Sequence, residues 1–336
     1  MTTVGIVDVG AYSPQCVQTA EEIGQFAGIP VDVLRDKFGL TGKHIAAPDE
    51  HVSDLAAKAA APVLMRNDGP IGAVIYMGSP HRDFAVWTTA PRVQALLGER
   101  VAGARAFDVQ CSSAGAPIAL QVGAGLIATD AGIDQVLLVG GSREHDLIDY
   151  SNTRSRFMFN FGAGGAAALL RRDHDRNHLL ATAAFTDSSF ADEVMVPAGG
   201  SREPASEETV RDRRHYLDVR DPAEMKARLD PISAENFIRV AHEAVERSGH
   251  TAREIDLLCT IHTKRSLYLR VLAGLGLTED RGIYLSDHGH MSACDPIFGL
   301  HRAREQGKLL EGALVVLLAA GTGYTWAATA VRWGRA

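Results

Sequence analysis

Hydrophobic positions along the chain fall into two alternating kinds of run. Short, continuous runs rich in Val, Ile and Leu are typical of strands buried on both faces of a sheet, and Ala-rich stretches between them are typical of helices packed on that sheet. After a first strand in "MTTVGIVDVGAYSP", the runs predict strands over 72–78, 105–111, 135–141, 165–172, 255–262, 282–289, 312–321 and 324–333. They predict helices near 52–66, 88–97, 114–130, 265–275 and 296–307. This alternation predicts an α/β fold.

The order of these elements recurs in the second part of the chain, which predicts an internal duplication. The spacing between Asp108 and Leu137 is almost the same as that between Tyr284 and Leu314. Equivalent strand ends would then face each other, and sites in α/β proteins form where strand carboxyl ends meet helix amino ends. Residues 186–235 interrupt the pattern with charged, irregular sequence. They are open to two interpretations, a solvated insertion or a lid over a substrate tunnel.

Composition narrows the possible classes of protein. The 336 residues are 46% hydrophobic and 22% charged with a formal net charge of -7, so no basic face for nucleic acid is expected. No apolar run approaches the roughly 18–20 residues of a membrane span, and the start lacks a signal-peptide pattern. The four cysteines have no CxxC spacing, which predicts reduced thiols in the cytoplasm and neither a zinc site nor disulfides. Because "GAGG" at 162–165 lacks the context of a dinucleotide site, no metal, nucleotide or flavin is predicted.

The stretch "FDVQCSSAGAPIAL", residues 107–120, has the pattern of a strand that enters a helix through a tight turn of small residues. Such turns present catalytic nucleophiles at the end of a sheet. Three adjacent side chains are candidates for that role, namely Cys111, Ser112 and Ser113.

Several segments of the chain resemble the ketosynthase III family, thiolase-fold enzymes that start fatty-acid and polyketide chains. They are "AFDV" with "AGA" (106–116) for the nucleophile turn, "FNFGAGGAAALL" (159–170) for "FGDGAGA", "IHTKRSLYLRVLAGLGL" (261–277) for "HQAN-R", "DHGHMSA" (287–293) for "GNTSAAS", and "AAGTGYTWAATAVRW" (319–333) for the closing Gly-rich hairpin. The resemblance implies a thiolase-like five-layered αβαβα fold of two duplicated halves, 1–172 and 173–336, related by a pseudo-twofold axis. It also implies a homodimer.

The resemblance places the family's catalytic cysteine at Ser113, five residues after Asp108. Cys111 comes two residues too early, still within the predicted strand, and is expected to be a small buried hydrophobic residue. Ser112 would point away from a site that Ser113 enters. We therefore expect Ser113 to be the nucleophile, with Cys111 as the alternative.

A serine hydroxyl needs a base to take its proton, and the resemblance points to one. His290 stands where the family has asparagine, and Asp295 stands where it has a small residue. A carboxylate on the far ring nitrogen of a histidine fixes its tautomer and stabilises the imidazolium. We therefore expect a Ser113–His290–Asp295 triad. Asp295 before Pro296 is also an N-cap signature, and the two roles are compatible.

Three further residues acquire roles from the resemblance. His262 matches the histidine that stabilises the thioester oxyanion or enolate in decarboxylative condensation; here it could orient an acyl carbonyl, assist the acceptor or have no role. The backbone N–H groups of Ser113 and Thr322 match the oxyanion hole, because a threonine side chain leaves the backbone donor intact. Trp87 matches an aromatic residue that reaches into the partner subunit's acyl pocket, with ordinary dimer packing as the alternative.

The expected triad resembles the acyltransferase-type branch of the family in antibiotic pathways. That branch moves an acyl group from a CoA or carrier-protein thioester to another carrier, a sugar or another acceptor, and we expect the same reaction here, through an acyl ester of Ser113. The alternatives are a decarboxylating starter condensing enzyme that uses Ser113, His262 and His290, and a catalytically silent subunit of a heterodimer. No cofactor is implied beyond the substrate thioester. Val33 and Lys37 stand where the family has tryptophan and arginine for CoA, which favours an acyl carrier protein as donor over free acyl-CoA.

Overall fold

The computed structural model describes residues 2–335, whose main feature is one mixed sheet of ten strands. Its strands are β1 (Val4–Tyr12), β4 (Ala73–Tyr76), β5 (Arg105–Asp108), β6 (Gln135–Ser142), β7 (Gly164–Arg172), β8 (Arg176–Thr186), β11 (Ile255–Thr260), β12 (Gly282–Ile283), β13 (Leu314–Gly321) and β14 (Thr325–Arg335). The helices are α1 (Ala20–Ala27), α2 (Val52–Arg66), α3 (Thr89–Leu97), α4 (Gly115–Thr129), α5 (Glu207–Arg211), α6 (Pro222–Leu229), α7 (Ser233–Arg247), α8 (Arg265–Gly274) and α9 (Asp295–Glu305). Two small two-stranded antiparallel sheets pair β2 (Cys16–Thr19) with β3 (Gly42–Ile45) and β9 (Val194–Met195) with β10 (Asp218–Val219).

The strand order is β12-β11-β13-β14-β8-β1-β7-β6-β4-β5. Five strands at one end of the sheet are arranged like the five strands at the other end. In one half β4 pairs parallel with β5 and β6, and β6 pairs antiparallel with β7; β11, β12, β13 and β14 repeat this arrangement in the other. β1 and β8 pair at the centre. The predicted α/β fold class is therefore confirmed. The first half ends with β7 at Arg172, and β8 begins the second at Arg176.

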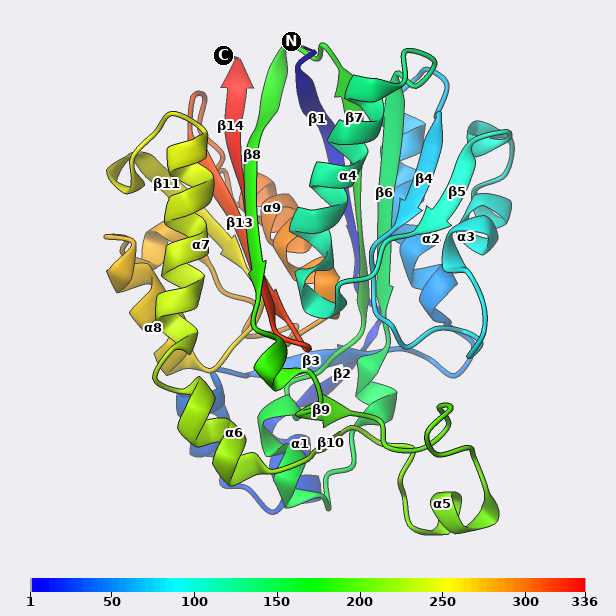
Figure 1. The fold of residues 1–336 in the computed structure, drawn as a ribbon, viewed down its shortest axis with the longest axis vertical. Coiled ribbons are helices and arrows are strands. Elements are labelled where there is room, and N and C mark those ends of the chain that lie inside the picture. The colour runs from blue at the N-terminus through cyan, green and yellow to red at the C-terminus, as the bar shows by residue number, and fades with distance from the viewer. Residues whose placement is uncertain (1, 336) are drawn as a thin grey trace.

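The helices form three layers around the two halves of the sheet. α4 and α9 lie in the middle and contact strands of both halves, α2 and α3 cover the first half, and α7, with α8 beside it, covers the second (Figure 1). Small residues allow α4 this position, because a Cβ on Gly123 would lie only 2.9 Å from Leu170 of β7. The five layers that the resemblance implied are the result.

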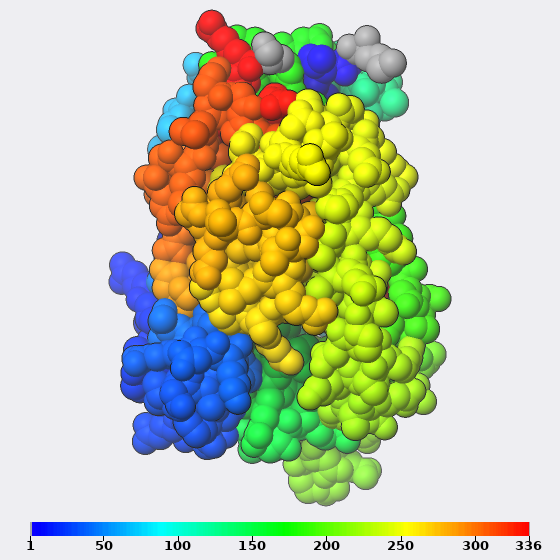
Figure 2. Space-filling view, turned by 90° about the vertical axis from the view of Figure 1, so that its left-hand side faces the viewer, coloured from blue at the N-terminus to red at the C-terminus, as the bar shows by residue number. Residues whose placement is uncertain are grey.

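A smaller lobe lies at the end of the sheet where the hairpin of β13 and β14 turns (Figure 1). Residues 20–45 and the insertion 186–235 form much of it, and both lie below α8 in Figure 2. One apolar cluster joins these segments through Leu34, Phe159, Val219 and Met225. The insertion is therefore solvated only in part: Val219 and Met225 are buried in this cluster, whereas much of its sequence before β10 is exposed. Its role as a lid stays a prediction.

Several elements differ from the expectation, among them the small helices and strands of the lobe, which were not predicted. The predicted strand over 282–289 is wrong beyond β12, because His288 N and Gly289 N both turn back to the carbonyl oxygen of Leu285. β8 and α7 were not predicted. Between residues 2 and 335, no helix combines the length and apolar character needed to cross a membrane.

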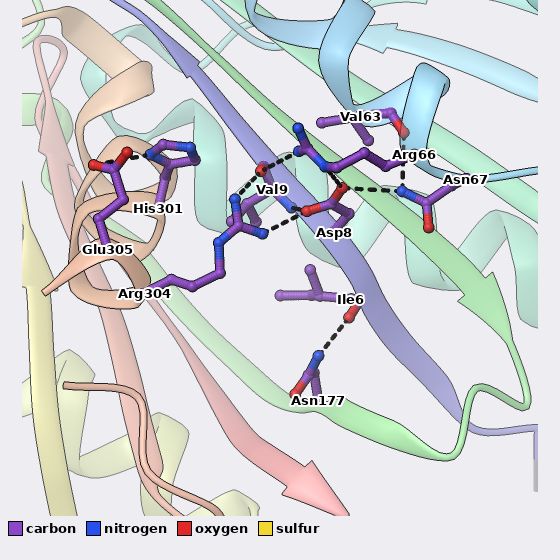
Figure 3. A network of polar contacts seen from close by, with 10 residues as sticks. All are labelled: Ile6, Asp8, Val9, Val63, Arg66, Asn67, Asn177, His301, Arg304 and Glu305. Carbon is purple, nitrogen blue, oxygen red and sulfur yellow. Dashed lines mark hydrogen bonds and ion pairs between the residues drawn. The ribbon is translucent and has the colours of Figure 1, made fainter. Parts of the chain in front are cut away.

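A polar network connects the two halves near the centre of the sheet (Figure 3). Asp8 of β1 is buried and accepts hydrogen bonds from Arg66 Nε (2.8 Å) and Asn67 Nδ2 (3.0 Å), which lie at the end of α2. Arg304 Nη1 of α9 donates to the other carboxylate oxygen (2.5 Å). Burial opposes ionisation, but the two guanidinium groups outweigh it and lower the pKa of Asp8. One carboxylate thus joins a helix of the first half to a helix of the second.

We expect Asp8→Asn to lower the free energy of unfolding by about 1–3 kcal/mol near neutral pH, because an amide cannot accept from all these donors. Since the folded-state pKa of Asp8 lies below its ordinary value, the carboxylate's contribution is complete above about pH 4 and is lost as the pH falls through the lowered pKa. Urea unfolding at several pH values measures the difference. The control is Asp130→Asn, which removes an exposed pair with Arg105. Equal effects of the two changes would contradict the connecting role of Asp8.

Candidate active site

A short turn between β5 and α4 carries the candidate nucleophile. β5 ends at Asp108, and Ser112–Ala114 form one turn of 3-10 helix directly before α4. Ser112 has a left-handed backbone (φ 44°), which is uncommon for a residue other than glycine and bends the chain sharply. Ser113 follows it and is 8% exposed. The expectation that Cys111 lies within the strand is wrong, because the strand ends before it and Cys111 belongs to the turn.

Ser113, His290 and Asp295 form a continuous chain of hydrogen bonds. Ser113 Oγ lies 2.7 Å from His290 Nε2, and His290 Nδ1 lies 2.6 Å from Asp295 Oδ2. Asp295 is fully buried, and its oxygens also accept from the backbone N–H groups of His262 (2.8 Å) and Met291 (2.7 Å). A carboxylate accepts only, so the proton of His290 is assigned to Nδ1, and Nε2 is left to accept from Ser113.

The N-cap interpretation of Asp295 is wrong. The turn Ser292–Cys294 leads the chain into α9 one residue earlier than expected, so Cys294 occupies the cap position and Asp295 is the first helical residue. Its carboxylate bonds residues outside the helix instead of the helix's own first N–H groups.

Burial and two carboxylates govern the charge of His290. Burial disfavours the imidazolium, yet Asp295, which also bonds the ring, and the charge of Glu144 outweigh it and raise the pKa of His290 above its ordinary value. Glu144 is itself buried and accepts a hydrogen bond from Ser79 Oγ (2.8 Å). A histidine whose imidazolium is stabilised in this way is a stronger base toward the Ser113 hydroxyl.

His262 lies next to this chain but in a different electrostatic state. Its Nδ1 is 2.8 Å from Asn160 Nδ2, and its Nε2 is 3.2 Å from the carbonyl oxygen of Gly39. Burial lowers the pKa of His262 to about 4, so the ring is neutral near pH 7. Asn160 was missed in the sequence. The available signal was its position in "FNFGAGG", where the family segment "FGDGAGA" has glycine.

The hairpin between β13 and β14 packs against the nucleophile turn. A Cβ on Gly321 would lie 2.5 Å from Cys111 O and 3.0 Å from Ser113 N, so glycine is required for this approach. The next residue, Thr322, donates its hydroxyl to Ser112 Oγ (3.0 Å). Ser113 and Thr322 therefore belong to two segments in contact, and their role as oxyanion donors stays a prediction.

The other sequence candidates lie outside this hydrogen-bonded chain. Burial raises the pKa of the Cys111 thiol, which is opposite to what an activated thiolate needs. Trp87 lies in the loop before α3, with its ring edge-on to Phe84 (5.4 Å). Val33 and Lys37 lie in the short π-helix Val33–Phe38 of the lobe.

A pocket of about 780 Å³ opens in the lobe and includes no member of the hydrogen-bonded chain. Its walls carry ion pairs of Arg154 with Asp218 (3.0 Å) and of Arg213 with Asp149 (2.7 Å). Across the described part of the chain, no three His, Cys, Asp or Glu side chains are grouped so that they could hold a metal ion.

Two protein-family models match the chain. The model described as 3-oxoacyl-[acyl-carrier-protein (ACP)] synthase III matches residues 107–188, which include Ser113. The model described as the C terminal of the same synthase matches residues 245–333, which include His262, His290 and Asp295. Together the two models span about half of the chain.

Curated relatives and solved structures match nearly the whole length. The beta-ketoacyl-[acyl-carrier-protein] synthase III of Symbiobacterium thermophilum is 28% identical over 339 residues, which cover 99% of this chain and 98% of the relative. The synthase of the same name from Syntrophomonas wolfei is 27% identical over 336 residues, with 99% and 98% covered. The solved synthase III of Thermus thermophilus has a TM-score of 0.85 and 26% identity, with 99% of this chain and 100% of that chain covered.

Proposed function

Since this chain belongs to the 3-oxoacyl-[acyl-carrier-protein] synthase III family, we propose that it transfers an acyl group from a thioester to an acceptor through an ester on Ser113. The observation that carries the proposal is the chain of hydrogen bonds from Ser113 through His290 to Asp295, with lengths of 2.7 Å and 2.6 Å. The proposed donor is an acyl-carrier-protein thioester, in keeping with the names of the relatives, or the corresponding acyl-CoA.

Both half-reactions use the same groups. His290 Nε2 takes the Ser113 proton as Oγ attacks the thioester carbonyl, and the N–H groups of Ser113 and Thr322 stabilise the tetrahedral anion. The C–S bond then breaks, and the imidazolium returns the proton to the leaving thiolate. In the second half-reaction His290 takes a proton from the acceptor's hydroxyl, thiol or amine, which attacks the ester. The imidazolium reprotonates Ser113 as it leaves, which completes a ping-pong transfer.

Decarboxylative condensation is the second candidate. The names of the relatives favour it. The position of His262 favours it as well, because its backbone N–H donates to Asp295 (2.8 Å) and the residue therefore lies beside Ser113 and His290. Condensation requires ring N–H donors that are free to hold an enolate oxygen. The Nε2 of His262 instead faces Gly39 O at 3.2 Å, and Asp295 fixes the proton of His290 on the far ring nitrogen. These two contacts favour acyl transfer.

The two candidates differ in the fate of carbon dioxide. We expect acyl-carrier-protein or acyl-CoA donors to add the mass of their acyl group to the protein, on the peptide that contains Ser113. We expect no labelled carbon dioxide from malonyl thioester labelled in its free carboxyl group, because transfer breaks the C–S bond of the thioester and the C–O bond of the Ser113 ester but no C–C bond. Intact mass, peptide mapping and radiolabel release measure this, with the Thermus thermophilus synthase as the decarboxylating control. Label release together with a product longer by two carbons would establish condensation instead.

The finer parts of the proposal rest on the sequence resemblance. We propose a place in polyketide or antibiotic-type secondary metabolism, and a homodimer in which Trp87 approaches the partner's acyl pocket. These parts are independent of the chemistry at Ser113, since a fold supports many reactions and pathways.

A further inference from the structure

One short segment, Phe159–Gly162, holds both histidines of the site. Its backbone forms a parallel bridge to His290, in which His290 N donates to Asn160 O (2.9 Å) and Gly162 N donates to His290 O (2.8 Å). From the same segment, the side-chain amide of Asn160 reaches His262 Nδ1 (2.8 Å). A movement of this segment would therefore displace the base and its neighbour together.

Lys43 of β3 anchors this segment. Its Nζ donates to the carbonyl oxygens of Phe159 (3.0 Å) and Phe161 (2.6 Å), on either side of Asn160. The side chain is completely buried, and within residues 2–335 no carboxylate lies at ion-pair distance from it. Burying an ammonium without a carboxylate costs several kcal/mol, and burial lowers the pKa of Lys43 to about 7. Stability alone would favour an apolar residue, so the lysine is explained better by the two carbonyls that it fixes.

Two carbonyl groups determine which nitrogen of His262 carries the proton. Asn160 Nδ2 faces the carbonyl oxygen of His262 (3.5 Å) as well as its Nδ1, so the NH₂ end of the amide must point this way. Nδ1 is then an acceptor, and the proton lies on Nε2, where it faces Gly39 O (3.2 Å). The opposite tautomer would set two N–H donors against each other at Nδ1, and the lone pairs of Nε2 and Gly39 O against each other at the other end of the ring. Asn160 Oδ1 has no hydrogen-bond partner in the described residues. A buried acceptor without a partner lowers stability, so stability alone does not explain an asparagine here.

We propose that Asn160, anchored by Lys43, is a positioning residue that keeps His262 neutral with its proton on Nε2 and leaves His290 as the only base at Ser113. The charged groups near the ring of His262 are Asp295, Asp287 and His290. A protonated His262 would add a positive charge beside His290 and weaken it as a base. Sites that separate the protonation states of two neighbouring groups give each a distinct role. The effect on catalysis rests on the proposed function, whereas the protonation of His262 does not.

Asn160→Asp tests the inference, because it keeps the shape of the side chain and replaces a donor by a carboxylate. Imidazole ¹⁵N shifts in protein labelled with [¹⁵N]histidine, assigned with His262→Gln, report the protonated nitrogen. We expect wild-type His262 to carry its proton on Nε2 and not to titrate between about pH 5.5 and 8.5. In Asn160→Asp, Nδ1 should become protonated. Acylation of Ser113 should slow by about 10- to 100-fold, the range seen when the partner that orients a metal-binding histidine is lost, with KM little changed.

The matched control is Asn177→Asp (Figure 3), where a similarly buried amide donates to Ile6 O (2.9 Å). It should leave the His262 shifts and acylation unchanged. If Asn160→Asp does not fold, Asn160→Gly removes the same donor and should give a mixture of tautomers. Lys43→Met should give this mixture as well, because it removes both donors to the segment. Lys43→Arg keeps a donor there and should leave His262 with its proton on Nε2.

Three results have distinct meanings. Wild-type His262 protonated on Nδ1, or shifts unchanged in the Asn160 variants, would overturn the inference. A change of tautomer with unchanged acylation would overturn the positioning role in catalysis. Absence of acylation in the wild type with every thioester would refute the proposed function, while the ¹⁵N shifts would still decide the protonation of His262.

Discussion

Ser113→Ala is expected to abolish the acyl-enzyme and to lower the rate of acyl transfer by about 10⁴-fold or more, the scale observed when a serine nucleophile is removed. Alanine keeps the backbone N–H groups of the turn, so donor binding should persist and KM should change little. Intact mass after exposure to acyl-carrier-protein and acyl-CoA thioesters, followed by peptide mapping, measures the loss. Turnover with a thiol or hydroxyl acceptor measures the rate.

Cys111→Ala is the matched control, because it removes a nucleophile from the same turn. Burial raises the pKa of the Cys111 thiol, so this variant should acylate as the wild type does. Ser113→Cys should still acylate, since a thiol at the same position faces the same base. An acyl group found on Cys111 in Ser113→Ala would show that the nucleophile has been misassigned.

Much of the fold could be predicted because buried strands and helices leave continuous apolar runs. The helix expected over 52–66 is α2, Val52–Arg66, and the strand expected over 135–141 is β6, Gln135–Ser142. β8 was missed since its sequence, "RNHLLATAAFT", mixes polar and small residues at partly exposed positions. α7 was missed although its buried residues, Phe237, Val240, Ala241, Ala244 and Val245, recur at helical spacing. In that case the signal was present in the sequence and was not used.

The site could be predicted only in part, for a different reason. Motif position identifies Ser113, His290 and Asp295 as candidates, but their contacts depend on how two distant loops meet. The strand predicted over 282–289 fails because the chain must turn after β12 to bring His290 over Ser113. Asn160 lies within the segment "FNFGAGG", but its contact with His262, like the contacts of Lys43, joins residues that lie far apart in the sequence. Hydrogen bonds of this kind become visible only in three dimensions.

Asp295→Asn is expected to lower the rate of Ser113 acylation by about 10³- to 10⁴-fold, because the amide fixes the wrong tautomer of His290. In the wild type, Oδ2 accepts from His290 Nδ1 and from His262 N, while Oδ1 accepts from Met291 N. An NH₂ group at Oδ2 would donate to Nδ1 and move the ring proton to Nε2, where it blocks the base. An NH₂ group at Oδ1 would instead oppose Met291 N–H. Neither orientation satisfies all three donors.

The pH dependence separates this electrostatic role from simple damage to the fold. His290 must be neutral to accept the Ser113 proton, so wild-type acylation is lost as the pH falls through the raised pKa of His290. Without the Asp295 charge, burial dominates, and the acid limb of the Asp295→Asn profile should move to lower pH even though its plateau is far lower. Glu144→Gln is the matched control: Glu144 raises the same pKa without a hydrogen bond to the ring, so the limb should move in the same direction while the plateau stays within about tenfold of wild type. Single-turnover acylation rates measured across the pH range decide this. An acid limb that stays in place in both variants would mean that the carboxylates do not control the base, and that the limb reports another group.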